Sequence, residues 1–96
     1  MNEKEKVQKS YRELERLVRG FANHRRIQML EMLKKQPEMS VDEIAALLDI
    51  SYKTVAAHMH RLAIGGLVLK RNQDVSVRHR LTPRAEFVLK FLRTLE

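Results

Sequence analysis

Between residues 51 and 61 the sequence combines hydroxyl, cationic and small side chains at helical spacing. Ser51 and Thr54 carry hydroxyls that suit phosphate contact at a helix N-terminus, where free N–H groups also favour anions. Lys53 can donate to guanine, and Ala56 and Ala57 are small enough to approach bases and touch a thymine methyl. The other polar members of this group are Tyr52, His60 and Arg61. Together these side chains have the chemistry of a nucleic-acid contact.

A second cationic group follows closely in two short runs of alternating character, expected as strands at 67–71 and 75–81. Residues 72–74 are expected to form the hairpin turn between them. The cations of this hairpin are Lys70, Arg71, Arg78 and Arg80. A basic hairpin beside a helix can lie over a nucleic-acid backbone or enter the minor groove.

A helix at about 52–63, capped by Ser51, would position the first group. Its buried face is expected to comprise Val55, His58, Met59 and Leu62, which leaves the polar group on the opposite face. Gly65 and Gly66 are expected to end this helix with a positive φ.

The preceding helix is predicted from the capping box of Ser40 and Glu43. Its inward residues are expected to be Ile44, Ala45, Leu47 and Leu48. The acidic residues Glu38, Asp42, Glu43 and Asp49 are interpreted as helix-start charge and solvated surface.

Three further helices complete the pattern, at about 4–19, at 24–35 and at 83–95, where Thr82 and Pro83 mark the start. The fold class is therefore mainly α with a small β-hairpin, in the order of four helices, two strands and a last helix. Two helices joined by a short turn and followed by a hairpin describe a winged helix-turn-helix, and the 96 residues form a single domain.

The charge is unevenly distributed. The chain carries 19 Lys and Arg against 12 Asp and Glu, a net charge of +7. The excess lies in 19–36 and 51–82, and an acidic stretch at 37–50 separates them. Such an excess of positive charge favours a polyanionic partner.

Several chemistries are excluded or disfavoured. The chain has no cysteine, so disulfides, thiolate nucleophiles and sulfur-ligated zinc are excluded. His58 and His60 point to different sides of one helix, and we expect no metal site and no cofactor. Neither a phosphate loop nor a nucleophile motif is present, so an enzyme is not expected. No apolar run approaches the roughly 20 residues of a membrane span and no signal peptide opens the chain, so a cytoplasmic protein is expected.

Five segments in register resemble ArsR-type winged-helix regulators. Residues 17–30 (LVRGFANHRRIQML) are similar to the opening helix of that family, and residues 40–45 (SVDEIA) to its next helix. The recognition helix is matched by Ser51-x-x-Thr54-Val55-x-x-His58-x-x-x-Leu62, its exit by Gly66-Leu67-Val68 and the end of the wing by Arg80-Leu81-Thr82. The resemblance implies a homodimeric transcriptional regulator, usually a repressor, that binds a partly palindromic operator through its recognition helix and wing.

The resemblance also implies that the terminal helices form the dimer interface, and the residues agree with this. The first helix has a narrow apolar seam, and the last has an apolar arc too wide for one small body to cover. The expected interface residues are Val7, Tyr11, Leu14, Val18, Val88, Phe91, Leu92 and Leu95. Metal sensing by the family's usual routes is not expected, because Ser40 and Asp42 replace the cysteines and the last helix has no histidine.

Two alternatives to a regulator of double-stranded DNA stay open. The basic face could meet an acidic protein, as a winged-helix interaction module in a larger nucleic-acid-associated complex. It could also bind RNA or single strands, but that would require stacking aromatics, and Tyr52 is the only aromatic residue on this face.

Overall fold

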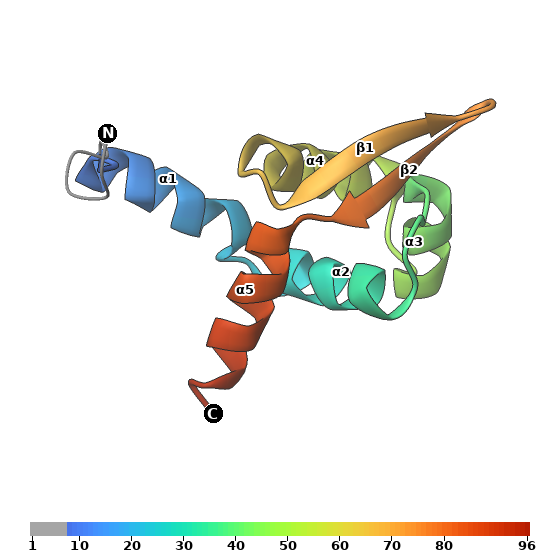
Figure 1. Ribbon diagram of the computed structural model, residues 1–96. Coiled ribbons are helices and arrows are strands. Elements are labelled where there is room, and N and C mark those ends of the chain that lie inside the picture. Colours follow the sequence, from blue (N-terminus) through green and yellow to red (C-terminus); the bar gives the residue numbers. More distant parts are fainter. Residues whose placement is uncertain (1–7) are drawn as a thin grey trace.

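The computed structural model describes residues 8–96, and its helices and strands follow the expected order (Figure 1). The helices are α1 (Tyr11–Phe21), α2 (His24–Lys35), α3 (Val41–Leu48), α4 (Tyr52–Ile64) and α5 (Pro83–Arg93). The antiparallel strands β1 (Val68–Gln73) and β2 (Ser76–Leu81) form the hairpin between α4 and α5. The predicted fold class is confirmed: the domain is a winged helix-turn-helix with the hairpin as its wing.

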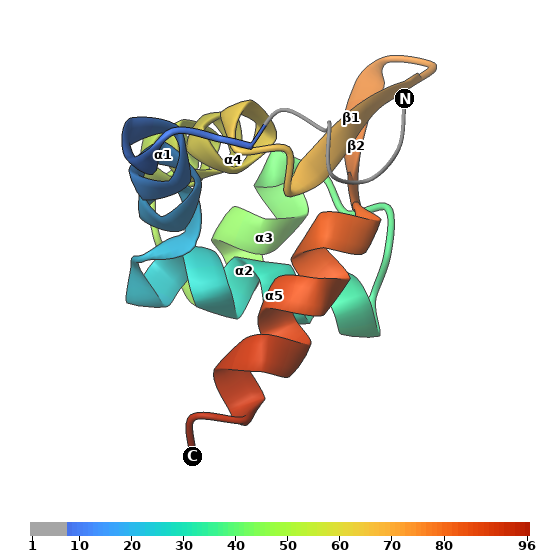
Figure 2. The same ribbon diagram turned by 60° about the vertical axis from the view of Figure 1, so that its left-hand side comes forward.

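The hydrophobic core lies where α2, α3 and α4 meet under the base of the wing. Its buried members come from α2, α3, α4, β1, α5 and two connecting segments, whereas α1 and β2 contribute only the partly buried Phe21 and Leu81. The core residues are Met29, Leu30, Leu33, Met39, Ile44, Val55, Met59, Leu62, Leu67, Val68, Ala85 and Leu89. α1 packs against α4, and α5 against α2, so both terminal helices lie at the periphery of this core (Figure 2).

The first helix begins at Tyr11, later than the expected position near residue 4. Ser10 is its N-cap, because the Ser10 hydroxyl accepts from the Glu13 N–H while the Glu13 carboxylate accepts from the Ser10 N–H. This capping box stops the helix from extending back through residues 8–10. Val7 lies outside the described residues. The last helix ends at Arg93, with Thr94 as its C-cap, two residues short of the expected position.

α3 forms at the capping box of Ser40 and Glu43, as predicted. The prediction that Leu47 lies inside was wrong, because 64% of its surface is exposed. A helix of only eight residues presents little more than one buried side chain per turn to α4, and Ile44 takes the central position. Asp49 then adopts a left-handed φ of 53°, which ends α3 and turns the chain into α4 within three residues.

A Schellman motif ends α4 and starts the wing. The Leu67 N–H donates to the Leu62 carbonyl at 2.9 Å, and the Gly66 N–H donates to the Ala63 carbonyl at 3.0 Å. Only Gly66 has a positive φ (70°), so the expectation that Gly65 shares this role was wrong. Leu62 and Leu67 are both fully buried, and they anchor the C-terminal end of α4 in the core.

The wing turns one residue later than expected. Gln73 pairs with Ser76, so the two-residue turn is Asp74-Val75 rather than residues 72–74. Asp74 has a φ of 56°, a conformation that Asp tolerates better than most residues. Val75 and Val77 are therefore exposed beyond the core, and burial on β2 begins at His79.

A short extended segment before α3 pairs with the base of the wing. Met39 and His79 form an antiparallel bridge in which the His79 N–H donates to the Met39 carbonyl at 3.0 Å. The His79 ring lies within 3.1 Å of the same carbonyl through Nδ1, and the residue is only 2% exposed. His79 therefore faces inward, beneath the base of the wing. Burial lowers the pKa of His79, and its hydrogen bond to Met39 only partly opposes this effect.

Candidate nucleic-acid interface

Two hydroxyl side chains, those of Ser51 and Thr54, lie together at the N-terminus of α4. The Ser51 hydroxyl accepts from the Thr54 N–H at 3.1 Å and lies 2.8 Å from the Thr54 hydroxyl. Both residues are exposed, and the first N–H groups of a helix have no partner within the helix. This end of α4 can therefore receive a phosphate oxygen.

The two faces of α4 separate nearly as the sequence predicts. Val55, Met59 and Leu62 are buried in the core and hold the helix against α2 and α3. Ala56 is half-buried at the boundary between the faces. The exposed residues of α4 are Tyr52, Lys53, Thr54, Ala57, His60, Arg61 and, at the C-terminal end, Ile64. The face they form offers cationic and polar groups around a small residue, with no bulky apolar side chain projecting from its centre.

His58 departs from the prediction that it lies in the core. It is half-buried at the contact of α4 with α2, where its Nδ1 lies 3.2 Å from Nη1 of Arg26. Burial, followed by the charge of Arg26, lowers the pKa of His58, so the neutral ring can accept from the guanidinium. Nη2 of Arg26 also donates to the Arg19 carbonyl at 3.1 Å, which ties α1, α2 and α4 together. The sequence pattern does not predict this role of Arg26, because a cation at such a helix position usually indicates a solvent-exposed side chain.

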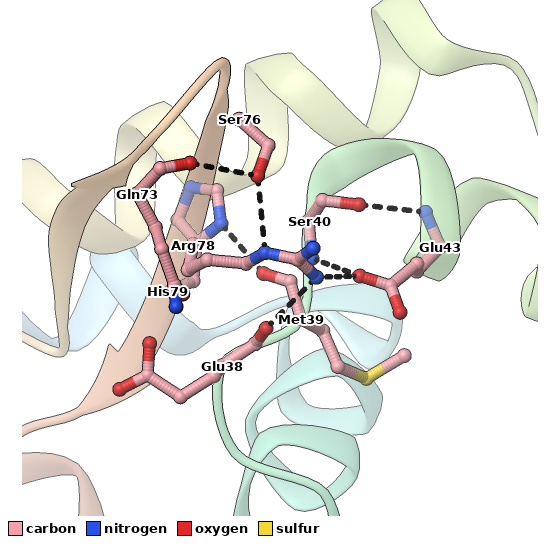
Figure 3. Close-up of polar contacts among 8 residues, drawn as sticks. All are labelled: Glu38, Met39, Ser40, Glu43, Gln73, Ser76, Arg78 and His79. Atoms are coloured by element: carbon pink, nitrogen blue, oxygen red, sulfur yellow. Dashed lines mark hydrogen bonds and ion pairs between the residues drawn. The ribbon is translucent and has the colours of Figure 1, made fainter.

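Arg78 does not point freely into solvent. Its guanidinium forms an ion pair with Glu43 of α3 and donates to the Glu38 carbonyl at 3.3 Å (Figure 3). Its Nε donates to the Ser76 hydroxyl at 3.2 Å. These contacts hold the side chain between the wing and α3, so Arg78 links two parts of the fold.

Glu38 performs a similar role for the other two arginines of the wing. Its Oε1 lies 3.2 Å from Nη1 of Arg71 and 3.7 Å from Nε of Arg80. Glu38 reaches them because its backbone has a left-handed φ of 69° just before the Met39 bridge. The sequence does not predict Glu38 as a partner of the wing, since Glu38 lies 33 residues from Arg71 along the chain.

Lys70 lies on β1 and is exposed together with Arg71 and Arg80. The structure thus places the four predicted cations of the wing on one hairpin. This hairpin is adjacent to α4, because α4 packs against β1. Within residues 8–96, no cluster of three or more metal-ligating side chains is placed to hold a metal ion. The helices of that same range also include none with the length and apolar character needed to cross a bilayer.

The terminal helices carry part of the exposed apolar surface of the protein. Tyr11 is 91% exposed on α1, and Leu14 and Val18 follow it on the same side. On α5, Phe91 is 50% exposed, and Val88 and Leu92 are half-buried around it. Leu95 lies just beyond the helix and is exposed. Both helices extend away from the tip of the wing (Figure 1).

The fold and these surfaces define a class, the winged helix-turn-helix domains. Residues 22–83 match the model of the HVO_A0114 family. None of the curated proteins matches this sequence.

Solved structures agree with this class. A homodimeric winged helix-turn-helix DNA-binding domain of Mycobacterium bovis, Mb0332, described as a possible ArsR-family transcriptional regulator, has a TM-score of 0.78 and 25% identity over 94% of this chain and 89% of that one. The transcriptional regulator HlyU of Vibrio vulnificus has 33% identity and a TM-score of 0.71 over 88% of both chains. The repressor PagR of Bacillus anthracis, at 23% identity and a TM-score of 0.73 over 86% of this chain and 99% of that one, shares the fold.

The chain therefore belongs to the HVO_A0114 family, and its structural neighbours place it among the ArsR-type winged helix-turn-helix transcriptional regulators. These neighbours are described as transcriptional regulators or possible transcriptional regulators.

Proposed function

We propose that this protein is a homodimeric transcriptional repressor that binds double-stranded DNA in a sequence-specific manner. The observation that carries the proposal is the exposed face of α4, which presents Lys53 and Ala57 outward while Val55 and Met59 anchor the opposite face in the core. A helix held this way, with a free N-terminal half, can enter a major groove.

The proposed DNA contacts divide by role. Lys53, Ala56 and Ala57 would approach base edges, and Ser51 and Thr54 would bind phosphate at the helix N-terminus. The remaining proposed contacts are Tyr52, His60, Arg61, Lys70, Arg71, Arg78 and Arg80. The wing cations would contact the backbone or the minor groove, and three of them would first have to exchange an intramolecular carboxylate for a phosphate.

The proposed dimer would form through α1 and α5, the terminal helices. Their exposed apolar side chains cannot be covered by a core of this size, and a domain of 96 residues gains much from a partner surface. Mb0332, which has this fold, is a homodimer. The proposed interface comprises Val7, Tyr11, Leu14, Val18, Val88, Phe91, Leu92 and Leu95.

The decisive experiment selects bound duplexes from a random pool with the full chain. The expected product is a two-fold symmetric site with half-sites about 10 base pairs apart, because each recognition helix enters one major groove on the same side of the duplex. A salt titration on the selected duplex should then yield a log–log slope of roughly −5 to −9, as expected for about 6–10 phosphate contacts. Absence of an enriched sequence together with a flat salt response would instead support a protein-interaction module.

A further inference from the structure

A hollow lined mainly by cations lies where α1 crosses the C-terminal end of α4, beside the start of α5. Its volume is about 420 Å³, within the range of about 300–1,000 Å³ typical of small-molecule sites. Residues of α1, α4 and α5, of the segment before α1 and of the loop after α4 form its walls. The lining residues are Lys9, Arg16, Leu17, Arg19, Gly20, Arg61, Ile64, Gly65 and Arg84.

Five of these nine lining residues are cationic, and none is acidic. Arg19 pairs with Glu15 on the outer side of α1 at 3.0 Å, and Nη1 of Arg84 donates to the Gly65 carbonyl at 3.0 Å. This hydrogen bond offsets the partial negative charge of one carbonyl at the C-terminal end of α4, which would otherwise repel an anion. Among the described residues, Arg16 and Arg61 form no ion pair.

The crowding of positive charge extends into the protein behind the hollow. Burial and the nearby charge of Arg61 both lower the pKa of Arg26, whose guanidinium bonds to the Arg19 carbonyl. Cations gathered without counter-charges repel one another at a cost in free energy. A bound anion would relieve that repulsion.

This surface is distinct from the proposed dimer face. Arg16 and Gly20 lie one turn apart on the side of α1 that faces α4, whereas Tyr11, Leu14 and Val18 lie on the opposite side. The hollow is also at the C-terminal end of α4, away from the N-terminal half that would enter a groove. A second copy of the chain docked on the apolar face of α1 would therefore leave the hollow open.

We propose that this hollow binds a compact multivalent anion of the phosphate class, such as pyrophosphate or the di- or triphosphate group of a small molecule. Arginine forks and a lysine suit phosphate oxygens, and several cations converging from three elements suit a multiply charged group better than a single carboxylate. The inference does not depend on DNA binding, although Arg61 belongs both to the hollow and to the proposed DNA contacts.

Isothermal titration of inorganic pyrophosphate into the full chain at fixed ionic strength tests the proposal. We expect saturable binding that Arg16→Gln weakens roughly tenfold, because it removes a charged hydrogen bond. Arg12→Gln is the matched control: it removes the same charge from an exposed position one turn from Arg16, but from a side chain that does not line the hollow, and should weaken binding clearly less than Arg16→Gln does. Both positions are exposed, so thermal melts should show that the two variants fold.

Equal losses in the two variants would overturn the proposal, because they would indicate diffuse attraction to a basic surface. Absence of saturable binding would overturn it as well. In that case duplex titrations would show whether the hollow serves DNA instead: a loss of duplex affinity in Arg16→Gln but not in Arg12→Gln would assign it to a backbone phosphate.

Discussion

Arg78 on the wing and Glu43 in the first turn of α3 form an ion pair that joins the hairpin to the helix-turn-helix. The same Glu43 carboxylate accepts from the Ser40 N–H at 3.0 Å, so one side chain caps α3 and holds the wing. The hydrogen bonds from Ser40, followed by the charge of Arg78, lower the pKa of Glu43. One carboxylate thus serves both the cap of α3 and the contact of α3 with the wing.

Glu43→Gln should loosen the wing while leaving α3 capped, because the amide oxygen can still accept from Ser40. We expect little change in the free energy of unfolding, since both partners are partly exposed. Amide hydrogen exchange in residues 68–81 should become faster. If Arg78 then binds phosphate, duplex binding should tighten and its log–log salt slope should steepen by about one. An unchanged slope with a loosened wing would indicate that Arg78 acts only within the fold.

Lys53→Ala and Lys70→Ala remove the same charge from two different elements. If α4 reads bases, Lys53→Ala should weaken the selected site roughly tenfold more than random duplex, since base contacts carry the sequence information. Lys70→Ala should weaken both duplexes alike and reduce the salt slope by about one. Competition binding on the two duplexes measures both effects. Uniform losses in both variants would argue against base reading by α4.

Phe91→Glu should disrupt the proposed dimer, because it places a charge in an apolar interface. Sedimentation equilibrium should show a dimer dissociation constant raised by roughly tenfold or more. Leu47→Glu is the control, since Leu47 is 64% exposed on α3, far from α5 in the fold, and its variant should assemble like the unmodified protein. If both variants assemble equally, the dimer interface does not involve Phe91 of α5.

Stability should fall as the pH drops below about 6.5. Burial lowers the pKa of both His79 and His58 below their ordinary 6.5, so the folded protein binds fewer protons than the unfolded chain in this range. The contribution of these two histidines to the free energy of unfolding is therefore fully present above pH 6.5, and it is lost as the pH falls toward their folded-state pKa values. The carboxylates Glu13 and Glu43, whose pKa values are lowered from 4.5, add a separate loss at more acidic pH.

Urea unfolding between about pH 7 and 5 measures the histidine effect. His79→Gln keeps a donor for the Met39 carbonyl but does not titrate, so its unfolding free energy should depend less steeply on pH than that of the unmodified protein. The exposed His60→Gln serves as a control and should retain the original steepness. An equally steep profile in His79→Gln would show that His79 does not carry the pH dependence.

Local signals in the sequence were sufficient for the helices that begin at a side-chain cap. Ser40, Ser51 and Thr82 each cap a helix where the sequence predicts one, because the N-cap interaction involves residues only three apart. The capping box of Ser10 was just as local and was overlooked, so the start of α1 was placed too early. The two faces of α4 also follow from helical periodicity, apart from His58.

The sequence by itself determined the order of elements, the caps, the exposed face of α4 and the absence of thiol chemistry, since each depends on residue type and short spacing. Tertiary structure alone decided the partners of the wing arginines, the contact of Arg26 with His58 and the cationic hollow beside α1. These join side chains that are distant along the chain, and periodicity carries no information about which surface charges meet. Glu43 reads as a helix-capping acid in the sequence; only the folded chain places Arg78 against it.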